Sequence, residues 1–132
     1  MSSINPKVMV IEDETLLLKA ICKKLSLENI ETISATNGKQ ALDYLSNLTE
    51  LPDAIWLDYY LKDTNGLDFM EELKKNKKWE NIPVIVVSNS ASPEKVHSML
   101  ALGAKKYLLK SQYRLEDIIK IIREFIKEEE KE

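Results

Sequence analysis

Acidic side chains follow directly on an apolar run near the start of the chain. The stretch KVMVIEDE, residues 7–14, passes from VMVI into Glu12, Asp13 and Glu14. Carboxylates about 4 Å apart repel each other by roughly 4 kcal/mol at an effective dielectric constant of about 20. Such a cluster at the edge of a core needs a cation, and hard oxygen ligands that leave positions for water suit Mg²⁺.

Other polar residues follow apolar runs in the same way. Asp58 comes after AIWL, Ser88 after VIVV and Lys110 after YLL. If these runs are strands of one parallel sheet, their carboxyl ends meet at one edge, where sites form in this class of fold. We therefore expect the carboxylates, the hydroxyl and the ammonium group to face a single crevice.

This set of groups predicts phosphoryl-transfer chemistry. Asp58 stands apart from the acidic pair and is flanked by the other groups, so it is the best candidate for a nucleophile that forms an aspartyl phosphate. Mg²⁺ held by Glu12, Asp13 and Asp58 would neutralise phosphate oxygens. Ser88 and Lys110 would hold phosphoryl oxygens by hydrogen bond and charge.

Apolar runs and amphipathic helical patterns alternate along the chain. Most of the runs are continuous, as in strands covered on both faces. Strands are expected at residues 8–11, 30–35, 54–57, 84–87 and 107–109, and helical stripes span residues 18–25, 41–48, 67–73, 96–100 and 115–126. Such βα units wind right-handed, so we predict an α/β, doubly wound fold with a parallel sheet and helices on both faces. Glu14 then falls in the first turn of a helix, where the dipole favours a carboxylate, and Ser92-Pro93 predicts a helix start.

The composition predicts one globular domain over residues 1–132. The chain has 132 residues and a net charge of −3, which argues against nucleic acid or an anionic membrane as a partner. Cys22 is the only cysteine, so an internal disulfide is excluded and a reducing compartment is favoured. No apolar run approaches the ~18 residues of a membrane span, and the first residues do not resemble a signal peptide. We therefore expect a cytoplasmic protein.

The motifs together resemble the receiver domain of bacterial two-component response regulators, the CheY-like family. The resemblance is carried by VIEDE, WLDYYLKDTNGLDF, IPVIVVSNSA and GAKKYLLKS, in the family's order and spacing, with Gly66 eight residues after Asp58. It covers about residues 6–127 and leaves residues 128–132 as a charged tail. It implies a flavodoxin-like (βα)5 fold with strand order 2-1-3-4-5.

The resemblance also implies a role for each site position. It implies that Mg²⁺ is held by Glu12, Asp13, Asp58 and the backbone carbonyl of Tyr60, and that Asp58 is the phosphoacceptor. Lys110 and Ser88 would contact the phosphoryl group, and Ser88 and Tyr107 would form the switch. Tyr60 and Ser90 would tune dephosphorylation. The chain departs from the family's pattern in four places. Ser111 follows the lysine where the family often has a cis proline, Lys62 replaces another frequent proline, Glu12 replaces aspartate, and Asn89 stands where a small residue is frequent.

The implied function is that of a signalling phosphoacceptor domain rather than an enzyme. Such a domain assists its own phosphorylation and dephosphorylation. Its partners would be a sensor histidine kinase or phosphotransfer protein and a downstream protein that binds the surface around residues 96–100, 107–109 and 115–126. A phosphorylation-linked homodimer is a further possibility. Direct binding to nucleic acid or membrane is not expected.

Rival functions fit the residues less well. A haloacid dehalogenase-type phosphatase would carry a second aspartate at position 60, where this chain has Tyr60. Residues 12–14 would repel the phosphate of a flavin nucleotide, and no P-loop motif occurs. The alternative left open is a pseudo-receiver, which keeps the fold as a constitutive protein-binding module without phosphorylation.

Overall fold

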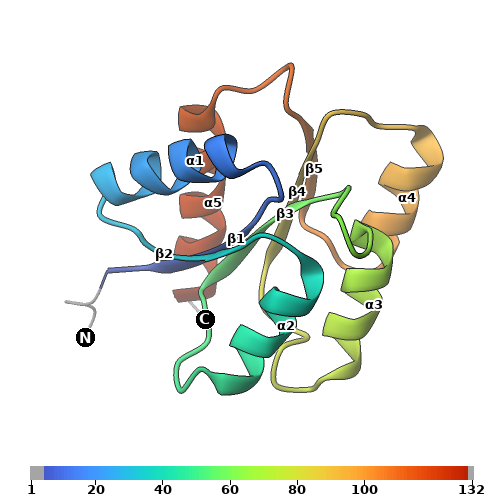
Figure 1. Cartoon of the computed structure of the whole chain (residues 1–132), viewed down its shortest axis with the longest axis horizontal. Helices are drawn as coiled ribbons and strands as arrows, with labels where there is room; N and C mark the ends of the chain where they lie inside the picture. Colours follow the sequence, from blue (N-terminus) through green and yellow to red (C-terminus); the bar gives the residue numbers. More distant parts are fainter. Residues whose placement is uncertain (1–4, 131–132) are drawn as a thin grey trace.

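Strands and helices alternate strictly along the chain. The computed structural model describes residues 5–130, and its elements fall into one five-stranded sheet and the helices around it (Figure 1). The elements are β1 Lys7–Ile11, α1 Thr15–Leu27, β2 Glu31–Ala35, α2 Gly38–Asn47, β3 Ala54–Asp58, α3 Gly66–Lys75, β4 Val84–Ser88, α4 Pro93–Ala101, β5 Lys106–Leu109 and α5 Leu115–Glu130. All strand pairs are parallel and the order is β2-β1-β3-β4-β5, which confirms the predicted fold.

Helices cover both faces of the sheet. Figure 1 shows α1 and α5 on one side and α2, α3 and α4 on the other. Successive residues of β1 point to opposite faces, so Val8 and Val10 pack with α1 and α5, whereas Met9 and Ile11 pack with the other helices. Both faces being buried explains why the strands read as continuous apolar runs.

The central strands extend one residue beyond their apolar runs. Asp58 is the last residue of β3 and lies opposite Val87, and Ser88 ends β4 opposite Leu109. The two polar residues therefore belong to the hydrogen-bonded ladder. Both residues are buried although they are polar.

Side chains cap three of the helices. Asn37, Asn65 and Ser92 accept from the amide three residues on, at the starts of α2, α3 and α4. Ser92-Pro93 begins α4 as predicted. Glu14 is the residue before α1 and makes no side-chain cap bond, so its predicted place inside the first turn was wrong by one residue.

The last helix runs into the segment expected as a charged tail. It continues to Glu130, and the remaining tail residues, 131–132, lie outside the described part. Within residues 5–130, no helix has the length and apolar character needed to cross a membrane.

Candidate functional site

The predicted site residues converge at the carboxyl edge of the sheet. Glu12 and Asp13 follow β1, and Asp58 ends the neighbouring β3. Carboxylate oxygens from these three residues lie within 4.8 Å of one another. The predicted convergence at the strand ends is therefore present, and the three carboxylates are close enough to share one cation.

Two of the three carboxylates are almost completely buried. Glu12 is 1% exposed and Asp58 is 6% exposed, whereas Asp13 is half-buried. The Glu12 amide donates to the Ala35 carbonyl at 3.0 Å, and its Oε2 accepts from the Glu14 amide at 3.0 Å. The first carboxylate is thus held in place by its own chain and by β2.

Lys110 reaches this cluster from the end of β5. Its Nζ donates to Glu12 Oε1 at 2.9 Å and to Asp58 Oδ2 at 3.4 Å, and its amide donates to the Ser88 carbonyl at 2.8 Å. Burial lowers the pKa of Lys110, but the hydrogen bond to Glu12 and the two negative charges outweigh it and raise the pKa. The described residues contain no cis peptide bond, so Lys110 reaches the carboxylates with a trans bond to Ser111.

The charges of the cluster do not balance. Burial first, and then the charge of Glu12, raise the pKa of Asp58 from 3.8 to about 7, and Lys110 lowers it only in part. Three carboxylates therefore face one ammonium group. Compact, hard oxygen donors with excess negative charge fit a small divalent cation such as Mg²⁺.

The hydroxyl groups of Ser88 and Tyr107 both contact Ser90, in the loop after β4. Ser88 is fully buried, and its Oγ accepts from the Ser90 amide at 3.3 Å. Tyr107 is half-buried and donates its hydroxyl to the Ser90 carbonyl at 2.8 Å, and burial raises the pKa of this phenol. The two expected switch residues are thus joined through one loop residue.

The residues expected to tune dephosphorylation also meet. Ser90 Oγ donates to the Tyr60 hydroxyl at 3.4 Å, and the Tyr60 amide donates to Asp58 Oδ1 at 3.4 Å. Lys95 of α4 also reaches this group, with its Nζ 4.5 Å from the centroid of the Tyr60 ring. Nothing in the spacing of these residues signals this contact.

Comparison with known proteins decides the family. The family model of the response regulator receiver domain matches residues 8–123. The chain belongs to this family. The match spans all five strands and nearly all of the helices, so the predicted resemblance is confirmed.

Relatives of this receiver come from distant organisms. The two-component response regulator ORR12 of Oryza sativa subsp. japonica is 30% identical over 106 residues, which are 80% of this chain and 87% of the relative. The sensor histidine kinase CheAY of Helicobacter pylori is 30% identical over 120 residues, which are 91% of this chain and 15% of that protein. Among solved structures, the Francisella response regulator 1452 receiver domain has 30% identity and a TM-score of 0.82, with 94% of this chain and 98% of that chain covered. A CheY-like receiver protein from Methanospirillum hungatei has 25% identity and a TM-score of 0.87, with 96% and 98% covered.

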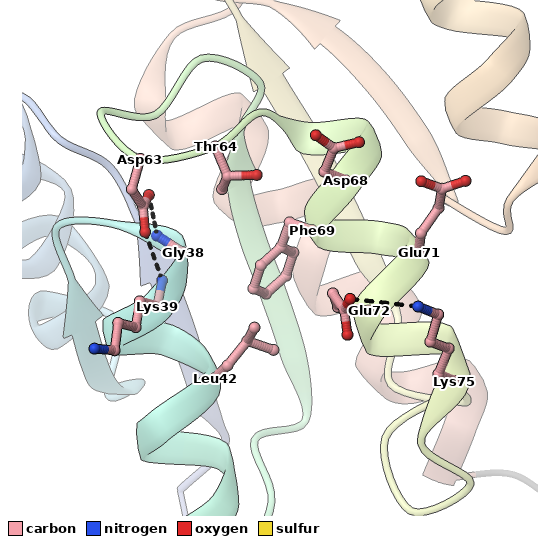
Figure 2. Close-up of a pocket in the computed structure, with 10 residues that line it drawn as sticks. All are labelled: Gly38, Lys39, Leu42, Asp63, Thr64, Asp68, Phe69, Glu71, Glu72 and Lys75. Carbon is pink, nitrogen blue, oxygen red and sulfur yellow. Dashed lines mark hydrogen bonds and ion pairs between the residues drawn. The ribbon is translucent and has the colours of Figure 1, made fainter.

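The receiver also has a broad groove away from the strand-end site. Figure 2 shows it between α2 and α3, with lining side chains of both charges. Its volume is about 560 Å³. On one side of it, Asp63 accepts from the amides of Gly38 and Lys39 at 2.9 Å each. Burial works against ionisation, but these N–H groups lower the pKa of Asp63. This contact ties the start of α2 to the loop after Asp58, and none of the predicted site residues lines the groove.

Proposed function

We propose that this receiver accepts a phosphoryl group on Asp58 from a phosphohistidine and uses it to change its protein contacts. One observation carries the proposal. A carboxylate at the end of a central strand shares a compact acidic cluster with Glu12 and Asp13 and is contacted by the Lys110 ammonium group. An acidic cluster built only for stability would be better neutralised than this one.

The proposed transfer is a displacement at phosphorus. An Asp58 carboxylate oxygen attacks the phosphorus atom, and the new P–O bond forms as the P–N bond to the donor histidine breaks. The electron pair of the P–N bond stays on the imidazole nitrogen, and no group is oxidised or reduced. Mg²⁺ on Glu12, Asp13, Asp58 and the Tyr60 carbonyl would supply charge neutralisation for the phosphoryl oxygens.

The chain's own groups would then hold the product. The Lys110 ammonium group would follow the new negative charge from the carboxylate to the phosphoryl oxygens. The Ser88 hydroxyl would donate to another of these oxygens. Its movement would pull on the loop at Ser90, to which Tyr107 is hydrogen-bonded. Phosphorylation would add a charge of about −1.5 to −2. For a partner protein to sense this charge at a distant surface, the charge must shift the equilibrium between two conformations of the receiver. We propose that the element that changes conformation is the Ser88–Tyr107 pair and that its output is the α4-β5-α5 surface.

The partners follow from this chemistry. The donor would be a histidine of a sensor kinase or of a phosphotransfer protein, and the reader a protein that docks on α4-β5-α5. The single-domain organisation, the cytoplasmic location and the phosphorylation-linked homodimer stay predictions.

The test is phosphorylation by a small acyl-phosphate donor in the presence of Mg²⁺, followed by intact mass measurement. Wild type should gain one base-labile phosphoryl group, Asp58→Asn should gain none, and Asp43→Asn should behave as wild type because Asp43 is exposed on α2. If wild type gains none from this donor or from a phosphorylated kinase domain, the proposal is wrong and the pseudo-receiver function stands.

A further inference from the structure

Aromatic rings pack beside the phosphoacceptor under a lysine side chain. The buried Tyr59 ring meets the Tyr60 ring edge-on, with centroids 5.0 Å apart and an interplanar angle of 69°. The centroids of Tyr59 and Tyr107 are 6.3 Å apart. Lys95 Nζ lies over both members of the first pair, 4.5 Å from the Tyr60 centroid and 5.3 Å from that of Tyr59. Tyr60 is 46% exposed, yet its ring contacts both a buried ring and a cation.

Both ends of this contact start from fixed backbone. Tyr60 forms an isolated antiparallel bridge with Asn65, which ties its backbone to the residue before α3. The amide of Lys95 donates to the Ser92 side chain at 3.2 Å, in the first turn of α4. The Tyr60 hydroxyl meets Ser90 Oγ at 3.4 Å, in the loop after β4. The ring thus spans from the loop after the acceptor strand to the loop after the hydroxyl strand.

We propose that Lys95 is a positioning residue, which holds the Tyr60 ring across this edge of the site and lengthens the lifetime of the phosphoryl group on Asp58. The inference rests on the proposed function and goes beyond it. In hydrolysis, a water oxygen attacks phosphorus as the bond to the Asp58 oxygen breaks, which yields inorganic phosphate and the free carboxylate. A ring that bridges the two loops narrows the approach of that water.

The hydroxyl contact alone is a weak restraint. At 3.4 Å, the Ser90–Tyr60 hydrogen bond is longer than the usual range for two hydroxyl groups. The ammonium group of Lys95 therefore supplies a second attachment for the ring. A cation–π contact at a partly exposed ring corresponds to about a two- to fivefold change in an equilibrium, which sets the expected change in lifetime.

The experiment compares the decay of the phosphorylated protein after removal of the small acyl-phosphate donor. Lys95→Met keeps the length of the side chain without its charge and should shorten the lifetime by about two- to fivefold. Lys95→Arg keeps a cation over the ring and should restore most of the lifetime. Lys77→Met changes an exposed lysine beyond α3 and should decay as wild type does.

A double-variant cycle tests the route through Tyr60. If Lys95 acts by positioning the ring, Lys95→Met should add nothing in a Tyr60→Ala background, and all variants should keep the thermal unfolding midpoint of their parent. Equal lifetimes of wild type and Lys95→Met would overturn the inference. An undiminished effect of Lys95→Met in the Tyr60→Ala background would also overturn it, because Lys95 would then act on the phosphoryl group directly. A wild type that accepts no phosphoryl group removes the proposed function and this inference with it, which separates that failure from the other two.

Discussion

The excess negative charge of the site predicts that removing the Asp58 carboxylate stabilises the metal-free protein. The pKa of Asp58 is raised to about 7, mainly by burial and then by Glu12, so folding disfavours its ionised form. A group of this kind stabilises the fold fully below its unfolded pKa of about 3.8, and that contribution is lost as the pH rises through about 7. The Asp58→Asn side chain cannot ionise. The free energy of unfolding of this variant should therefore exceed that of wild type by an amount that grows as the pH rises.

The magnitude follows from the size of the pKa change. About 1.4 kcal/mol per pH unit gives an upper bound of roughly 4 kcal/mol at pH 8. Asp58 is 6% exposed, but the nearby Lys110 ammonium group partly neutralises its charge, and the half-buried Asp13 beside it lets solvent screen the cluster, so the expected gain lies below this bound. We expect Asp58→Asn to raise the free energy of unfolding by about 1–3 kcal/mol at pH 8, with a smaller gain at pH 5.

Urea unfolding in the presence of a chelator measures this difference. Wild type and Asp58→Asn would be compared at pH 5, 6, 7 and 8, with Asp43→Asn as the matched control for the change of residue type. A gain that grows with pH only for Asp58→Asn supports the charge argument. An Asp58→Asn protein that is no more stable than wild type at pH 8 would refute it, because the carboxylate would then be adequately neutralised.

Other perturbations of the site should have distinct signatures. Lys110→Met leaves the Glu12 carboxylate, 1% exposed, without its ammonium partner and should lower the free energy of unfolding at pH 8 by about 1–3 kcal/mol in urea; an unchanged value would contradict the pairing. Glu12→Gln with Asp13→Asn should keep or raise metal-free stability but weaken Mg²⁺ binding more than about tenfold by calorimetry. Because bound Mg²⁺ competes with the proton on Asp58, wild-type affinity should be about five- to tenfold higher at pH 8 than at pH 6, and a flat profile would argue against this link. Tyr60→Ala should shorten the lifetime of the aspartyl phosphate, and an unchanged lifetime would show that the ring does not limit water.

The sequence pattern was sufficient to predict a parallel sheet covered by helices and the meeting of its strand ends, whereas the order of the strands came from the resemblance to the receiver family. Continuous apolar runs identify strands buried on both faces, and the polar residue that ends each run marks the edge at which sites form. The two central strands were predicted to end one residue too early, before Asp58 and Ser88. The hydrogen-bonded ladder is made by backbone groups, so it continues through a residue with a polar side chain. The resemblance, rather than periodicity, supplied the roles of the individual residues.

Contacts between side chains of different elements could not be predicted in the same way. Lys110 was expected to hold phosphoryl oxygens beside Asp58. In the structure its Nζ lies closer to Glu12 Oε1, at 2.9 Å, than to Asp58 Oδ2, at 3.4 Å. Which carboxylate it favours depends on where flexible side chains end in space, and spacing carries no information on that. The same holds for Lys95, whose position over Tyr60 is set by the start and direction of α4.

The pairing of Lys110 with Glu12 changes how the crowded acids after β1 are understood. Glu12 is buried but has its own cation and a backbone donor, so it is a satisfied part of the fold. The unmet charge falls on Asp58, the proposed phosphoacceptor, and on the half-buried Asp13. A protein selected for stability alone would neutralise that charge, since exchanging a strained ionic cluster for better-paired or apolar residues is often stabilising. If the proposed function holds, keeping the imbalance at the end of β3, within the β3–β4 ladder, leaves a position where a cation and a phosphoryl group would change the energy of the fold without a rearrangement of the sheet.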